Sequence, residues 1–302
     1  MTARQYATPL AFKQALEQRL KSSSATGVDF ARRRQLLVFD RFLARLARVA
    51  GDAVTLKGGL VLELRLARAR TTKDIDLRMM GSSDDVLERL QEAGRLDLGD
   101  HMLFEVQPDA DHPEIQNEGM RYDGFRYRTE CRLAGMIYSR PFGVDVAFGD
   151  PLVGEPDIVT GDDILGFAGI APPSLRLYPV VSHIAEKLHA FTMPRPRPNS
   201  RVRDLPDLAL LATIGPIDGV VLRRAIEKTF DYRGTHAVPA TVPSPPALWE
   251  ASYAAMAASD ELAWATLAEV AQAAALFLDP VLAPGECGSW DSASWAWSGM
   301  SR

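Results

Sequence analysis

The sequence is poor in cysteine: Cys131 and Cys287 are the two that occur in 302 residues, and they do not form a CxxC pair. A disulfide framework or a structural zinc site needs several cysteines at short spacing, so we expect neither. Low cysteine use is typical of a reducing compartment, and we expect the protein to be located in the cytoplasm.

Long apolar runs and a positive net charge are also missing. No run approaches the roughly 18 apolar residues of a membrane-spanning helix, and residues 1–6 contain no apolar signal core. We therefore expect a soluble protein with no membrane partner. The formal net charge of −5 argues against a basic coat over the whole surface, although clustered arginines could still line a local groove. There is no GxGxxG or P-loop motif, which argues against a generic two-domain metabolic enzyme.

What is present is the composition of a globular protein, with 47% hydrophobic and 24% charged residues. The predicted fold class is α+β, with a mixed, largely antiparallel sheet that helices precede and follow. The predicted domains are N-terminal helices over residues 1–50, a core over 51–175, and a C-terminal helical domain over 176–302 that ends in a tail rich in Ser, Gly and Trp.

The predicted elements follow from hydrophobic periodicity. Two helices, separated by serines 22–24, cover residues 8–50, and a third covers 83–93. Short strands are predicted at 53–57, 74–79, 102–107, 124–134, 136–140 and 143–148. Later helices are predicted at 180–193, 205–212, 219–231, 246–257 and 261–278.

Arginines gather in three places. The strand at 125–133 alternates an apolar face with a basic one, the second helix carries arginines along one side, and residues 193–201 alternate Pro and Arg, which predicts an extended basic loop. Each is either a solvated surface or the border of an RNA groove, and the sequence leaves both open. The tryptophans of the tail could likewise dock on the protein itself or on a partner.

The most informative motif is Lys57-Gly58-Gly59, which closes an apolar strand, followed by Asp74 and Asp76 on the next strand. Side chains at i and i+2 of a strand share a face, so these carboxylates point the same way. Paired carboxylates suit hard divalent cations, and glycines let backbone N–H groups approach a triphosphate. Separately, the glycines could be a tight turn and the carboxylates solvated side chains; together they indicate a nucleotidyl-transfer site.

A third carboxylate is predicted in Gly-Val-Asp-Val-Ala-Phe at 143–148, where Asp145 lies on the face opposite to the valines. A buried aspartate needs partners, which a metal ion or the polar groups of a neighbouring strand could supply. The alternative is an exposed edge strand with one outward carboxylate.

Further blocks then complete a pattern that resembles a known family. These are Arg-Thr-Thr-Lys-Asp-Ile-Asp-Leu at 70–77, Val-Asp-Val at 144–146, Glu-Lys-Leu-His-Ala at 186–190 and Arg-Asp-Leu-Pro-Asp-Leu at 203–208. With the glycine motif they are similar to the AbiEii-type nucleotidyltransferase toxins, which include the MenT-like toxins and belong to the DNA polymerase β-like nucleotidyltransferase superfamily. One departure is Leu60, where many members have Ser or Thr after the glycines; Thr71 or Thr72 could supply the missing hydroxyl.

The resemblance implies a role for each matching residue. The implied metal ligands are Asp74, Asp76 and Asp145, and two Mg²⁺ ions are expected. The implied catalytic residues are Asp74, Asp76, Lys187 and Asp207. The implied nucleotide-binding residues are Lys57, Gly58, Gly59, Thr72, Lys187 and Asp204.

Lys187 and the aspartates of the last block also have simpler interpretations. Lys187 could extend from a half-buried helix to solvent, and its neighbour Glu186 could pair with a turn. Asp204 could cap a helix whose first turn holds Pro206, with Asp207 facing free N–H groups. His183 and His189 are expected to be packed or hydrogen-bonded helix residues rather than catalysts.

The function predicted from these observations is transfer of NMP from an NTP to an RNA acceptor, the 3′ end of tRNA being the first candidate, with a block of translation as the outcome. A cognate antitoxin is the expected protein partner. The alternatives are a nucleotidyltransferase that acts on a protein or on a small molecule such as an antibiotic, and an inert relative that binds a partner.

Overall fold

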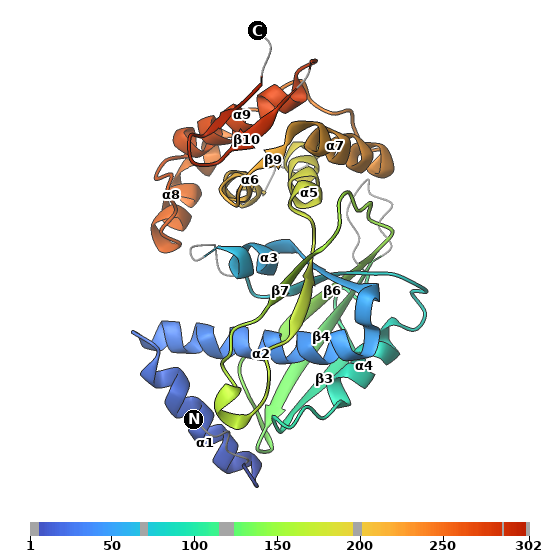
Figure 1. Cartoon of the computed structure of the whole chain (residues 1–302), viewed down its shortest axis with the longest axis vertical. Helices are drawn as coiled ribbons and strands as arrows, with labels where there is room; N and C mark the ends of the chain where they lie inside the picture. Colours follow the sequence, from blue (N-terminus) through green and yellow to red (C-terminus); the bar gives the residue numbers. More distant parts are fainter. Residues whose placement is uncertain (1–5, 67–71, 115–123, 196–200, 286, 300–302) are drawn as a thin grey trace.

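The computed structural model describes residues 6–66, 72–114, 124–195, 201–285 and 287–299 (Figure 1). A β-sheet flanked by N-terminal helices occupies the lower half of the view in Figure 1, and the C-terminal helices occupy the upper half. None of the helices in these ranges combines the length and apolar character that a bilayer crossing requires.

The N-terminal region forms helices α1 (Pro9–Ser22) and α2 (Gly27–Ala50), as predicted. Thr8 and Thr26 cap them, each accepting a hydrogen bond from a backbone N–H group of the first turn. The arginines of α2 do not form one basic face. Arg41 and Arg45 are buried and pair with the buried carboxylate of Asp100, so they anchor α2 to the segment before the third strand.

Within the described residues, eight strands form one mixed sheet in the order β3-β4-β6-β2-β1-β8-β7, and β5 pairs with β4. The strands are β1 (Val54–Lys57), β2 (Ile75–Met79), β3 (Met102–Pro108), β4 (Gly124–Leu133), β5 (Met136–Ile137), β6 (Phe142–Phe148), β7 (Asp157–Thr160) and β8 (Ser174–Leu177). The first six were predicted. Strands β7 and β8 were not predicted, because four residues are too few to establish an alternating pattern.

Two faces of the sheet have different environments. Ile75 and Leu77 of β2 are buried in the same core as Phe39 and Phe42 of α2, and helix α4 (Val86–Arg95) packs beside them. Side chains alternate along a strand, so Asp76 points to the opposite face. Strands β2 and β6 run parallel in a register that pairs Asp76 with Asp145, and the buried valines of β6 confirm that Asp145 shares this opposite face. Helix α3 (Gly58–Arg65) follows β1 directly.

The C-terminal helices are α5 (Val180–Thr192), α6 (Asp204–Ala212), α7 (Gly219–Arg233), α8 (Glu250–Ser259) and α9 (Leu267–Leu282), with 3-10 turns at Gly51–Ala53, Gly166–Ala168 and Ala247–Trp249 elsewhere in the chain. The predicted start of the last helix at 261 is wrong: α9 starts at Leu267. Thr266 and Glu269 form a capping box there, with each side chain bonded to the other's backbone N–H group.

The tryptophan-rich tail docks on the protein itself. Strands β10 (Ser289–Asp291) and β11 (Ala296–Trp297) form a hairpin that pairs with β9 (Ile217–Asp218). The indole of Trp290 is buried and donates a hydrogen bond to the carbonyl of Ala212 at 2.8 Å. The tail therefore belongs to the hydrophobic cores of the C-terminal helices, which are separate from the core under the sheet. The domain boundaries at 50/51 and 175/176 stay a prediction.

Candidate active site

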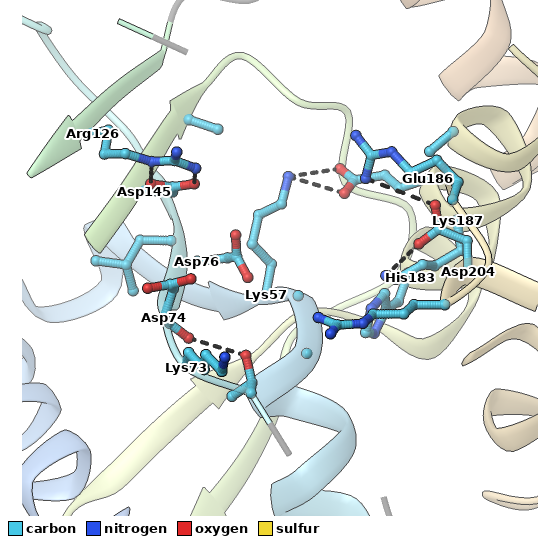
Figure 2. A pocket seen from close by; sticks show the side chains of 18 of the residues that line it. Lys57, Lys73, Asp74, Asp76, Arg126, Asp145, His183, Glu186, Lys187 and Asp204 are labelled. Atoms are coloured by element: carbon cyan, nitrogen blue, oxygen red, sulfur yellow. Dashed lines mark hydrogen bonds and ion pairs between the residues drawn. The ribbon is translucent and has the colours of Figure 1, made fainter. Parts of the chain in front are cut away.

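A cavity of about 750 Å³ lies between the open face of the sheet and helices α5 and α6 (Figure 2). It is lined by every residue that the sequence analysis assigned to the site except Asp207, namely Lys57, Gly58, Gly59, Thr72, Asp74, Asp76, Asp145, Lys187 and Asp204. Asp207 is fully buried behind Lys187. The fold thus gathers residues that are up to 150 positions apart in the sequence.

The glycine motif forms a corner between β1 and α3. Gly58 has φ +69°, and a Cβ atom at this position would lie 2.0 Å from Oδ2 of Asp76. A side chain is therefore excluded both by the backbone conformation and by the carboxylate next to it. The first turn of α3 leaves backbone N–H groups without helical partners, which suits this corner to an anion.

Three carboxylates face the cavity from neighbouring strands. Asp74 lies one residue before β2, and its Oδ1 accepts a hydrogen bond from the backbone N–H of Gly143 at 3.0 Å. Asp76 and Asp145 are direct neighbours in the parallel pair β2–β6. Burial raises the pKa of Asp76 to about 6, the charge of Asp145 adds to this effect, and Lys57 and Lys187 act against it. The three carboxylates form a local concentration of negative charge that a divalent cation would relieve.

The structure adds Arg126 to this group, which the sequence analysis did not single out. Its Nε and Nη2 atoms donate to Oδ1 and Oδ2 of Asp145 at 2.7 and 2.6 Å (Figure 2). The alternating pattern of β4 placed Arg126 on the polar face, but nothing in the sequence gives the register that sets it opposite Asp145. Among the described residues, no group of three His, Cys, Asp or Glu side chains is arranged to hold a metal ion as it stands.

Lys187 is held by both aspartates of the last block. Its Nζ lies 2.8 Å from Oδ1 of Asp204 and 2.8 Å from Oδ2 of Asp207. The alternative interpretation, in which Asp204 caps α6, does not hold: Asp204 is the first residue of that helix, and no side chain caps it. Both carboxylates turn to Lys187 instead, which remains 14% exposed at the cavity wall.

Lys57 is part of a second buried network. Its Nζ pairs with Asp150, which follows β6, and lies 2.9 Å from Oε2 of Glu186 on α5. Arg233 of α7 also contacts Asp150, at 3.2 Å, and the hydroxyl of Tyr178 donates to Glu186 at 2.9 Å. Glu186 therefore joins this network rather than pairing with a turn, and the sequence analysis missed the partnership because its members are distant in sequence.

The remaining residues have simpler surroundings. Thr72 is buried at the cavity, and its hydroxyl donates to the carbonyl of Asp74 at 3.3 Å; Thr71 lies outside the described residues. His189 is hydrogen-bonded to Thr235 at 2.8 Å, as expected for a helix residue. His183 is buried in the cavity wall, where neither ring nitrogen has a hydrogen-bond partner among the described residues. Burial lowers the pKa of His183 to about 3, so its imidazole is neutral.

Comparisons with known proteins place the fold and the family. Among solved structures, the nucleotidyltransferase toxin MenT4 from Mycobacterium tuberculosis is 20% identical, with a TM-score of 0.51 and 74% of each chain covered. JHP933 from Helicobacter pylori is 16% identical, with a TM-score of 0.44 and coverage of 83% of this chain and 90% of that one. A putative nucleotidyltransferase from H. pylori has 16% identity, a TM-score of 0.43 and coverage of 82% and 92%. At these identities the likeness concerns the fold alone, and it rests on MenT4, whose TM-score is above 0.5.

A comparison with curated proteins gives no match. A family model described as nucleotidyl transferase AbiEii toxin, type IV toxin–antitoxin system, matches residues 41–275. This range covers more than half of the chain and contains the glycine corner, the three carboxylates and Lys187. The family description implies an NTP substrate and an antitoxin partner. The chain therefore belongs to the AbiEii family of nucleotidyltransferase toxins.

Proposed function

We propose that this nucleotidyltransferase transfers NMP from an NTP to the 3′ end of tRNA and so blocks translation. The observation that carries the proposal is the meeting of three carboxylates and Lys187 at one cavity that several arginines also line. The reaction is an in-line attack by the acceptor hydroxyl on the α-phosphate, with pyrophosphate as the leaving group.

The chemistry of the donor set suits Mg²⁺, and the proposal is that two ions bind here. Carboxylate oxygens are the ligands that this hard cation prefers, and Asp74, Asp76 and Asp145 supply them from adjacent positions in the sheet. When bound, the ions would activate the acceptor hydroxyl and neutralise charge at the reacting phosphate. The fold holds the three carboxylates in place. Asp76 and Asp145 belong to paired strands, and Asp74 accepts a hydrogen bond from the backbone of Gly143.

The triphosphate would lie between the glycine corner and Lys187. Gly58 and Gly59 present backbone at the start of α3 without side chains in the way. Lys187 offers a point charge, and its two aspartate partners hold the ammonium at the cavity wall instead of letting it extend into solvent. Asp204 and Asp207 thus position Lys187, and contact between Asp204 and the nucleotide stays a prediction.

The acceptor is inferred from the charge around the cavity. Arg195, Arg201 and Arg203 line it from the connection between α5 and α6, Lys73 lines it from the segment before β2, and Arg126 lines it from β4. Basic side chains on both sides of an opening suit a polyanionic strand despite the net charge of −5. The described lining of the cavity contains no arginine of α2, and two of these arginines, Arg41 and Arg45, are buried against Asp100.

The test is to incubate the purified protein with Mg²⁺, total RNA and each α-³²P-labelled NTP in turn. We expect label in RNA of tRNA size, lost by orders of magnitude in Asp76→Ala and kept in Asp84→Ala, which removes an exposed carboxylate outside the cavity. Label in protein or in a small molecule instead would replace the acceptor that we propose. No NTP turnover with any acceptor would contradict the reaction itself.

A further inference from the structure

We propose that Arg126 is the resident counter-ion of Asp145, that it must leave this carboxylate before a divalent cation can bind there, and that it then pairs with the triphosphate. Arg126 would in this way make metal binding and NTP binding depend on each other. The inference rests on the proposed role of Asp145 as a metal ligand.

The geometry of the pair carries the first step. Both oxygens of Asp145 accept hydrogen bonds from one planar guanidinium, at 2.7 and 2.6 Å, which is the two-pronged arrangement of a strong arginine–carboxylate pair. Strands β4 and β6 place the two residues directly opposite each other, so the contact is built into the register of the sheet. A cation that takes the lone pairs occupied by the guanidinium has to displace it, and a cation at the remaining lone pairs of Asp145 would be repelled by the positive charge beside them.

Two lysines of the cavity wall have carboxylate partners of their own. Lys57 pairs with Asp150 and Glu186, and Lys187 pairs with Asp204 and Asp207. Asp74, Asp76 and Asp145 together with Arg126 leave two formal negative charges, which one divalent cation would balance. Release of Asp145 from Arg126 would leave three negative charges and so favour a second cation.

The surroundings of Arg126 give the released guanidinium a place to go. Its side chain is 41% exposed and lines the cavity, whereas the side chain of Asp145 is 15% exposed. The pair is therefore open to solvent from the arginine side. The oxygen atoms of a triphosphate in the cavity could accept two hydrogen bonds from the guanidinium, as the two carboxylate oxygens do. NTP would thus promote cation binding, and the cation would strengthen NTP binding by the same factor.

The test measures Mn²⁺ binding to the full chain without nucleotide, by electron paramagnetic resonance or calorimetry. Loss of charge-assisted hydrogen bonds of this kind predicts that Arg126→Gln binds Mn²⁺ about ten- to a hundredfold more tightly than the wild type. Arg128→Gln is the matched control: this arginine is two residues along the same strand, is 62% exposed and pairs with Glu130. It should change the affinity by less than about threefold, because it lacks contact with Asp145.

A double-substitution cycle separates direct competition from general charge. In an Asp145→Asn background, Arg126→Gln should no longer improve Mn²⁺ binding. The proposal would be overturned if Arg126→Gln and Arg128→Gln raised the Mn²⁺ affinity equally. It would also be overturned if Arg126→Gln still raised the Mn²⁺ affinity in the Asp145→Asn background. If Arg126→Gln does not fold, Arg126→Lys takes its place, with a smaller gain because lysine cannot hold both oxygens.

The coupling to nucleotide has its own readout. In the RNA-labelling assay, Arg126→Gln should raise the KM for the NTP although it binds Mn²⁺ more tightly. An unchanged KM would overturn the second half of the proposal. Failure of the proposed function would look different: Mn²⁺ binding would be insensitive to Asp76→Asn in the wild-type background, and the inference about Arg126 would fall with it.

Discussion

At the scale of single residues, Gly58 shows why the glycine motif precedes the carboxylates. Its positive φ and the 2.0 Å approach of the Asp76 carboxylate to the position of a Cβ atom leave room for hydrogen alone. The conformation and the contact act together, because a side chain would have to displace a proposed metal ligand. The same motif therefore sets the backbone of the phosphate corner and the place of Asp76.

We expect Gly58→Ala to abolish labelling of RNA and to lower the free energy of unfolding by about 1–3 kcal/mol, from backbone strain and overpacking. Urea denaturation measures the second effect. Gly27→Ala is the control, since a Cβ at Gly27, in the first turn of α2, would meet nothing within 4 Å. Full activity in Gly58→Ala would show that the corner tolerates a side chain.

Asp40 of α2 gives a pH dependence that is independent of the site. Burial raises the pKa of Asp40 to about 7, Arg41 lowers it, and Asp162 and Asp100 raise it. The carboxyl group of Asp40 therefore binds its proton more tightly in the native chain than in the unfolded chain, where its pKa is 3.8. Protonation of Asp40 therefore contributes fully to the free energy of unfolding below about pH 4, and this contribution is lost as the pH rises through 7.

Asp40→Asn should remove this loss. We expect the variant to match the wild type near pH 4 and to exceed it at pH 8 by up to about 4 kcal/mol in the free energy of unfolding. Urea denaturation at both pH values measures the difference. Asp84→Asn, which changes an exposed carboxylate, should keep the wild-type profile. Equal stability of Asp40→Asn and the wild type at pH 8 would contradict the raised pKa.

At the scale of helices and strands, the sequence predicted the elements whose pattern is local. Strands β1, β2 and β6 and helix α5 carry the site, and each has a clear run of apolar residues, so their residues could be assigned to a site before their positions were known. Pairing between elements could not be predicted. The register that sets Arg126 opposite Asp145, and the approach of Glu186 to Lys57, depend on sheet order and helix packing. A single sequence contains no direct signal for either.

The tie between α5 and α6 is an element-scale feature that can be measured. Lys187 carries the charge that both buried aspartates of α6 need, so Lys187→Met and Asp207→Asn should each lower the free energy of unfolding by about 3 kcal/mol. The double variant should lose less than the sum, because the partners are removed together. Arg33→Gln, which breaks an exposed pair with Asp29, should cost below about 1 kcal/mol. Additive losses would show that the two residues act separately.

At the scale of the whole molecule, the cavity lies between two parts with separate hydrophobic cores. Carboxylates come from the sheet, and Lys187 comes from the helices, so the site is complete when both parts keep their relative position. The network of Lys57, Asp150, Glu186 and Arg233 crosses between the parts beside the cavity. Figure 2 shows Lys57 between the carboxylates of the sheet and Glu186 on α5. This network is suited to hold the two halves of the site together.

Glu186→Gln tests that role, because it removes a charge that Lys57, Arg233 and the hydroxyl of Tyr178 all contact. All five tryptophans lie in the C-terminal half, at 249, 264, 290, 295 and 297, so their fluorescence reports unfolding of the helical part, whereas circular dichroism reports the whole chain. In the wild type we expect the two urea transitions to coincide. In Glu186→Gln the two transitions should separate, and the free energy of unfolding of the less stable part should fall by about 1–3 kcal/mol. Glu88→Gln, at an exposed position of α4, should leave them coincident. Coincident transitions in Glu186→Gln as well would mean that apolar packing, rather than this network, couples the sheet to the helices across the cavity.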